Sequence, residues 1–227
     1  MTDDRRYWLV SLMLSVVGGF TDAGSFVLAH SFTGHITGNS ILLAIALAGG
    51  RWGEVAICLV AIAAFLAGTA TGAGWPVAPH HSACRRLAGP ILVETLLIAF
   101  GLACSALPSP AGRVALLACL CLALGVQNGA LGKIASVPFH TTFITGLSTS
   151  LVTSLVAGKP DAKRRVLPPI IACFLVGAFL GAFTVSHFGA ARFTVVLAPL
   201  VITWLLALSA PSQPLHDPCS STPLLPR

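Results

Sequence analysis

The chain has 227 residues, of which 56% are hydrophobic and only 9% are charged. A soluble globular domain carries about 25% charged residues because its surface faces water, so this composition excludes a soluble enzyme. The net charge of +6 comes from small basic clusters between apolar runs. These clusters are typical of membrane loops, and no basic stripe interleaved with aromatics indicates a nucleic-acid partner. We expect an all-α protein in the lipid bilayer, with one membrane domain over residues 1–210.

Eight apolar stretches follow one another along the chain. They cover residues 7–28, 36–50, 55–75, 88–107, 114–132, 142–158, 166–187 and 193–210. A membrane-spanning helix needs roughly 20 apolar residues, and the second and sixth stretches are short and rich in Thr, Gly, Asn or Ser at their starts. The sequence therefore predicts six to eight transmembrane segments, two of them short or re-entrant. The Pro- and Ser-rich residues 211–227 are predicted to form a disordered tail.

The basic residues leave two topologies open. Both place the N-terminus and the basic cluster at 159–165 in the cytoplasm. If all eight stretches cross the membrane, Arg51 and Arg113 lie inside; if the two short ones are re-entrant, both lie outside. Three other residues then move inside: Arg85, Arg86 and Lys133. The positive-inside rule favours six spans but does not decide between the two.

Three landmarks recur in the same order in the two halves of the chain, residues 7–107 and 114–210. The first half contains Gly19-x-x-Asp22, Ile36-Thr37-Gly38 and Phe65-Leu66-x-Gly68-x-x-x-Gly72. The second half contains Gly125-x-Gln127-Asn128, Ile144-Thr145-Gly146 and Phe174-Leu175-x-Gly177-x-x-x-Gly181. This pattern predicts an internal two-fold repeat, as in many secondary transporters. Six spans would make the repeats inverted, whereas eight would make them parallel.

Asp22 is a carboxylate in the interior of the first apolar stretch. A lone charge in hydrocarbon is costly, so Asp22 should face protein or a cavity. It either couples transport to a proton or cation, or it caps a helix broken near Gly18, Gly19 and Gly24. Its partner in the repeat is Asn128, with Gln127 beside it.

The second and sixth stretches begin with similar polar residues. They are Thr37, Gly38 and Asn39 in the first half, and Thr145 and Gly146 in the second. Thr and Asn are good N-cap residues, and a helix that starts at membrane depth presents free N–H groups and a positive dipole end. We expect these residues to line a path for a small polar or anionic substrate. The alternative is that they are ordinary caps at the membrane surface.

Other polar and small residues have simpler interpretations. Gly68, Gly72, Gly177 and Gly181 are predicted to allow close helix packing. Glu94 lies near one end of the fourth stretch and is expected to reach the interface or to pair with a cation. No Gly-x-Ser-x-Gly motif and no metal-type spacing of Cys or His is present, so we expect no enzyme activity, no metal and no cofactor.

The landmarks together resemble the YoaK-type bacterial membrane proteins, a family of unknown function. Gly19-x-x-Asp22-Ala23, Thr37-Gly38-Asn39 and Gly125-x-Gln127-Asn128 carry the resemblance, which extends from about residue 7 to residue 210. It implies a multi-pass protein of the bacterial inner membrane but no substrate. From the repeat we expect a small secondary transporter or permease, and the alternative is a non-transporting scaffold or partner subunit. The sequence leaves homo-oligomerisation open.

Overall fold

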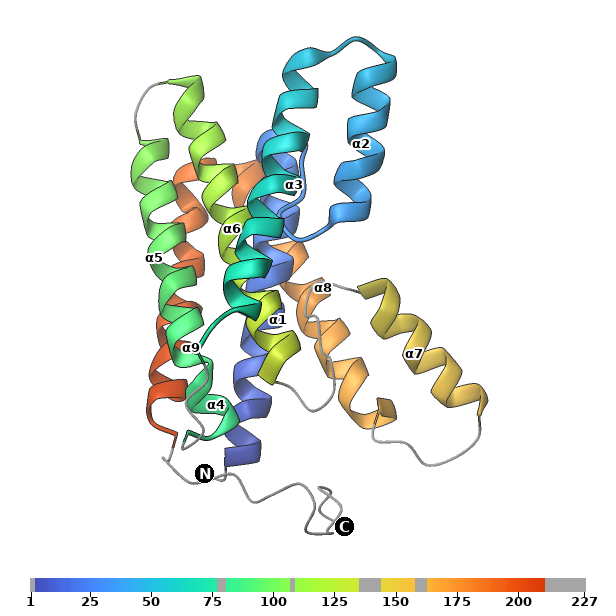
Figure 1. Ribbon diagram of the computed structural model, residues 1–227, viewed down its shortest axis with the longest axis vertical. Helices are drawn as coiled ribbons and strands as arrows, with labels where there is room; N and C mark the ends of the chain where they lie inside the picture. Colours follow the sequence, from blue (N-terminus) through green and yellow to red (C-terminus); the bar gives the residue numbers. More distant parts are fainter. Residues whose placement is uncertain (1–2, 77–80, 107–108, 135–143, 158–162, 211–227) are drawn as a thin grey trace.

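The computed structural model describes residues 3–76, 81–106, 109–134, 144–157 and 163–210, and every regular element in these ranges is helical (Figure 1). The elements are α1 (Asp3–Ala29), α2 (Ile36–Ala48), α3 (Trp52–Ala73), α4 (Ala83–Arg86), α5 (Ala88–Ser105), α6 (Pro110–Ile134), α7 (Ile144–Val156), α8 (Lys163–Phe188), the 3-10 helix η1 (Ala190–Val196) and α9 (Leu197–Leu208).

Within the described residues, six helical segments are long and apolar enough to cross a membrane. They are α1, α3, α4 with α5, α6, α8, and η1 with α9. In Figure 1 successive segments run in alternating directions, so the start of α1 and the end of α9 lie at the same end. The prediction of a multi-pass helical membrane protein is therefore confirmed.

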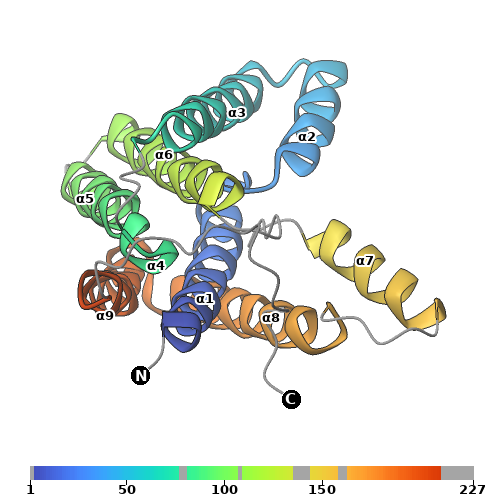
Figure 2. The same ribbon diagram turned by 60° about the horizontal axis from the view of Figure 1, so that its bottom comes forward.

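The two remaining apolar helices, α2 and α7, have 13 residues each. At 1.5 Å per residue each is about 20 Å long, which is less than the roughly 30 Å hydrocarbon core of a bilayer. Figure 2 shows both at the periphery, extending outward from the cluster of long helices. In Figure 1, α2 lies along the upper part of α3 and α7 along the lower part of α8.

Two pairs of long helices make the most extensive contacts, α1 with α8 and α3 with α6. In the first pair, a Cβ added at Gly177 would overlap the carbonyl oxygen of Val16, and one at Gly181 that of Phe20. A Cβ at Gly19 of α1 would in turn overlap the carbonyl oxygen of Phe174. The backbones of α1 and α8 can approach this closely only because glycine occupies these positions.

The second pair is built in the same way. Added Cβ atoms at Gly68 and Gly72 of α3 would overlap the carbonyl oxygens of Leu122 and Val126 in α6. One at Gly125 of α6 would overlap that of Phe65. The four glycines that the sequence predicted for helix packing therefore all lie where two backbones meet.

Several arginines at the end of the bundle that carries the N-terminus cap helix C-termini. Arg6 donates to the Ser209 hydroxyl oxygen at 2.8 Å, and Arg85 donates to the carbonyl oxygen of Leu208 at 2.8 Å, both at the end of α9. Arg164 donates to the carbonyl oxygen of Ser154 at 2.6 Å, at the end of α7. A cation is favourable there because helix C-termini carry unpaired carbonyls and the negative end of the dipole.

Replacing Gly72 by alanine tests the glycine interface. The added methyl group overlaps the α6 backbone, so we expect Gly72→Ala to destabilise the fold by about 1–3 kcal/mol and to lower the apparent melting temperature in detergent. Gly53→Ala, in the same helix with no atom within 4 Å of the added Cβ, is the matched control. It should leave the melting temperature unchanged or raise it. Equal melting temperatures for the two variants would contradict the interface.

Candidate functional site

The segment between α1 and α2, residues 30–35, is not helical and returns the chain into the bundle (Figure 1). It starts at His30, whose φ of 51° is left-handed, and the His30 N–H donates to the carbonyl oxygen of Phe26 at 2.9 Å. Irregular backbone inside a membrane protein must find hydrogen-bond partners within the protein. The contacts of this segment therefore define the site.

Asp22 supplies acceptors for the segment. Its Oδ1 accepts the backbone N–H of Thr33 and of Gly34, each at 2.8 Å, and the Thr33 hydroxyl at 3.2 Å. The Asp22 residue is only 4% exposed. Hydrogen bonds to an ionised acceptor are among the strong ones. Asp22 thus holds the backbone of the segment in place at Thr33 and Gly34.

Asn39, in the second turn of α2, holds the other side of the same segment. Its Oδ1 accepts the Phe32 N–H at 2.8 Å and the Ser31 hydroxyl at 3.1 Å, and its Nδ2 donates to the Phe32 carbonyl oxygen at 2.7 Å. Ser25 of α1 adds a bond from its hydroxyl to the carbonyl oxygen of Ser31 at 2.9 Å. Asp22, Ser25 and Asn39 together tie the segment to both neighbouring helices, and we call this set the hairpin latch.

The latch lies at mid-height in the bundle. The carbonyl oxygen of Phe32 is 3.8 Å from Sγ of Cys121, which lies near the middle of α6. The ring of Phe32 stacks on that of Phe26, with centroids 4.6 Å apart, and it also contacts Gly38. The start of α2 is thereby held at mid-height along the bundle and not at its end.

Two expectations for this region are wrong in detail. Helix α1 is unbroken from Asp3 to Ala29, so Asp22 does not cap a break within it; its donors come from the following segment. Thr37 and Asn39 lie inside α2, and the N-cap position is His35, whose side chain makes no capping bond. Asn39 turns back to the preceding segment because buried backbone groups there need partners. Thr37 is exposed.

The second half places its candidates differently. Gln127 and Asn128 are both buried in α6; Gln127 Nε2 donates to the carbonyl oxygen of Leu14 at 3.3 Å, and Asn128 Nδ2 to that of Leu124 at 2.8 Å. Thr145 is exposed in the first turn of α7, beside the partly buried Gly146. The position that matches Asn39 holds Leu147, which packs on Leu167 and Ile170 of α8.

Five of the eight predicted site residues therefore form two groups, to which Thr37, Thr145 and Gly146 do not belong. The first is Asp22, Gly38 and Asn39, joined through residues 31–34. The second is Gln127 and Asn128 on α6, where Gln127 contacts α1 at Leu14. Leu14 is about 12 Å before Asp22 along α1, so the two groups lie at different depths on the same helix.

Glu94 is fully buried, so the expectation that it reaches the interface is wrong. The reason is α4. The apolar segment begins at Ala83 and not at Ala88, which moves Glu94 to the middle of a 23-residue span. Ser31 and Thr33 were also missed as site residues. The pair Thr33-Gly34, typical of a turn between two helices, was the available signal.

In the parts of the chain that the structure describes, no group of three or more His, Cys, Asp or Glu side chains is placed to hold a metal ion. The predicted disordered tail at 211–227 lies outside the described residues. The polar side chains of the latch and of the segment it holds are one carboxylate, one amide and the hydroxyls of Ser25, Ser31 and Thr33.

Comparison with known families identifies the family to which the chain belongs. Residues 10–208 match the family described as "Protein of unknown function (DUF1275)". The chain belongs to this family. Neither a curated protein nor a solved structure matches it. The family covers nearly the whole membrane domain, including α2 and α7, so both short helices are part of the DUF1275 domain.

The latch can be tested by hydrogen exchange. Asp22→Ala removes the acceptor of the Thr33 and Gly34 amides, and bonds to a charged group contribute roughly 1.5–3 kcal/mol. We expect exchange of these amides, followed by mass spectrometry in detergent, to be at least about tenfold faster, since 1.4 kcal/mol corresponds to a factor of ten. Asp22→Asn keeps an oxygen acceptor and should have a smaller effect. Thr37→Ala, at an exposed position, is the control and should leave the exchange unchanged.

Proposed function

We propose that this DUF1275 protein is a small secondary transporter or permease whose substrate is a small polar molecule or anion. One observation carries the proposal: two short helices, α2 and α7, lie along opposite halves of the bundle, and α2 is held by its N-terminal segment at mid-height. Discontinuous helices that start at membrane depth are typical of transporter binding sites, because their N–H groups and dipoles face the substrate.

We propose further that the two halves are inverted repeats. The helix contacts support this, because the partners of the glycines correspond position by position. Gly19 and Gly125 occupy matched places, and so do the residues they touch, Phe174 in one half and Phe65 in the other. The remaining matched pairs are Gly177 with Gly68, Val16 with Leu122, Gly181 with Gly72, and Phe20 with Val126. Three spans in each half give the halves opposite orientations.

The proposed location is the bacterial inner membrane with the N-terminus in the cytoplasm. The end of the bundle that holds the N-terminus carries most of the arginines: Arg5, Arg6, Arg85, Arg86, Arg164 and Arg165. The opposite end carries Arg51, Arg113 and Arg192, and Arg51 is paired with Glu54 at 2.9 Å. Cytoplasmic loops are enriched in Lys and Arg, so this asymmetry favours an N-terminus inside.

The side of the membrane on which the turn between α2 and α3 lies distinguishes six spans from eight. We expect an epitope inserted after Gly50 to be accessible to protease in intact spheroplasts, since a re-entrant α2 returns to the outer face. An epitope at the N-terminus is the control, because both topologies place it inside, and it should be cleaved only after permeabilisation. Protection of the Gly50 epitope in intact cells would contradict the inverted arrangement.

In the proposed site, Asp22 exchanges the coupling proton or cation, and the backbone N–H groups at the start of α2 face the substrate. The second group, Gln127 and Asn128, lines the proposed path at another depth, level with Leu14 of α1. All three side chains are buried in the bundle, where polar groups are costly and usually serve a pathway.

Transport is tested with purified full-length protein in liposomes containing a pH-sensitive dye. A panel of small anions and polar metabolites is added outside, and proton movement is followed. We expect at least one substrate to move protons faster than in empty liposomes, and Asp22→Asn to remove most of that flux while the protein remains folded. Glu54→Gln, a surface carboxylate at the start of α3, should transport like the unmodified protein.

The scaffold alternative is favoured by a different observation, that Asp22 and Asn39 already bind the protein's own backbone. A purely structural latch predicts no substrate-dependent flux with any member of the panel. It also predicts that Asp22→Asn changes stability alone. Flux from the unmodified protein that is unaltered by Asp22→Asn would refute the coupling role of Asp22 but not transport itself.

A further inference from the structure

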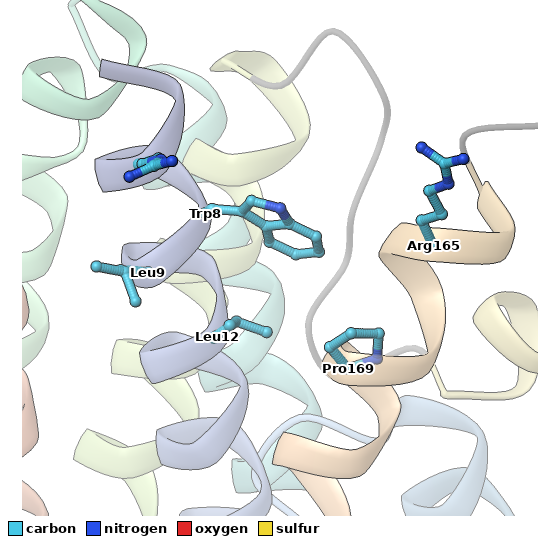
Figure 3. Close-up of a pocket in the computed structure, with 6 residues that line it drawn as sticks. Trp8, Leu9, Leu12, Arg165 and Pro169 are labelled. Atoms are coloured by element: carbon cyan, nitrogen blue, oxygen red, sulfur yellow. The ribbon is translucent and has the colours of Figure 1, made fainter. Parts of the chain in front are cut away.

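A groove lies between the first turns of α1 and α8, at the end of the bundle that holds the N-terminus (Figure 3). Its volume is about 730 Å³. Six of the described residues line it: Arg5, Trp8, Leu9 and Leu12 from α1, and Arg165 and Pro169 from α8. Figure 3 shows Trp8 and Leu12 on one wall, facing Pro169 on the other.

The groove follows from the way α1 and α8 pack. The two helices run in the same direction and touch where Gly177 meets Val16. Counting back from this contact brings Trp8 level with Pro169, and Arg5 within one residue of Arg165. None of these four positions is a glycine. Their side chains therefore keep the two helices further apart here than at the contact of Gly177 with Val16, and a space remains between them.

The groove is polar at its outer end and apolar at its inner end. The arginines occupy the first turns of the two helices, whereas Leu12 lies about 10 Å deeper than Arg5 along α1. Among the described residues neither Arg5 nor Arg165 has a hydrogen-bond or ion-pair partner. The neighbouring arginines differ, since Arg6 binds the end of α9 and Arg164 the end of α7.

We infer that the groove binds an anionic glycerophospholipid from the leaflet at this end of the bundle. Its phosphate lies between the two guanidinium groups, which match phosphate oxygens in geometry and charge. One acyl chain lies along Trp8, Leu12 and Pro169. Basic pockets between membrane helices are typical sites for anionic headgroups, and Trp prefers this interfacial depth.

The matched positions of α6 and α3 carry none of the polar or aromatic residues that line the groove. When Gly19 is aligned with Gly125, Arg5 aligns with Ala111. When Gly177 is aligned with Gly68, Arg165 aligns with Ala56. Trp8 matches Val114. The arginine pair and the tryptophan therefore occur at one end of the protein only. This inference does not depend on transport.

The test uses the full chain in phosphatidylcholine liposomes that contain a minor fraction of brominated lipid, because bromine quenches a nearby tryptophan. We expect brominated phosphatidylglycerol to quench Trp8 at lower mole fraction than brominated phosphatidylcholine does. At about fivefold per basic residue, the preference from two arginines should approach about 25-fold. Trp8→Phe should abolish the difference between the two lipids, and Arg5→Gln with Arg165→Gln should reduce it to near onefold.

The matched control is Arg113→Gln with Arg192→Gln, which removes two exposed arginines at the opposite end and should leave the preference unchanged. Equal quenching by the two brominated lipids would overturn the inference. A preference that survives loss of both groove arginines would overturn it too. If the double variant instead changes the oligomeric mass in detergent with no change in quenching, the groove is an interface between copies of the chain and not a lipid site.

Discussion

The segment at 30–35 places backbone N–H groups at mid-height in a membrane protein, where no lipid group can accept them. This constraint determines the polar chemistry of the first half. Asp22 accepts from Thr33 and Gly34, and Asn39 exchanges two bonds with Phe32. Each unsatisfied group in hydrocarbon would cost several kcal/mol, so the short helix α2 can begin inside the bundle only with these partners.

In the proposed repeat, the two halves share their helix packing but not their polar contacts. Glycines at matched positions join α1 to α8 and α3 to α6, because close backbone contact depends on the absence of a side chain. The side chains that face the short helices differ: Asp22 is matched by the neutral Asn128, and Asn39 by Leu147. Packing has the same geometric requirement in both halves, whereas the position that matches Asp22 holds no carboxylate. A single carboxylate, and not a pair, is what the proposed coupling role requires.

Much of the fold could be predicted because apolar runs bounded by polar residues determine membrane helices directly; α2, for example, was expected at 36–50 and spans Ile36–Ala48. Six spans could not be separated from eight, since hydropathy does not reveal whether an apolar helix crosses or turns back. The partners of Asp22 could not be predicted either, because they are backbone groups positioned by the turn after His30. Glu94 was misplaced because its depth depends on α4, a single helical turn with two arginines that no apolar pattern marks.

The structural and coupling roles of Asp22 are consistent with each other in the proposed transport cycle. All three bonds that hold Thr33 and Gly34 end on Oδ1, so the position of these two residues depends on one carboxylate oxygen. Protonation weakens an acceptor, because a neutral carboxyl group forms weaker hydrogen bonds than an ionised one. A proton that binds Asp22 would thus loosen the residues that start α2, and its release would fix them again. The same contacts that allow α2 to begin at mid-height would then link proton binding to the movement of the proposed site.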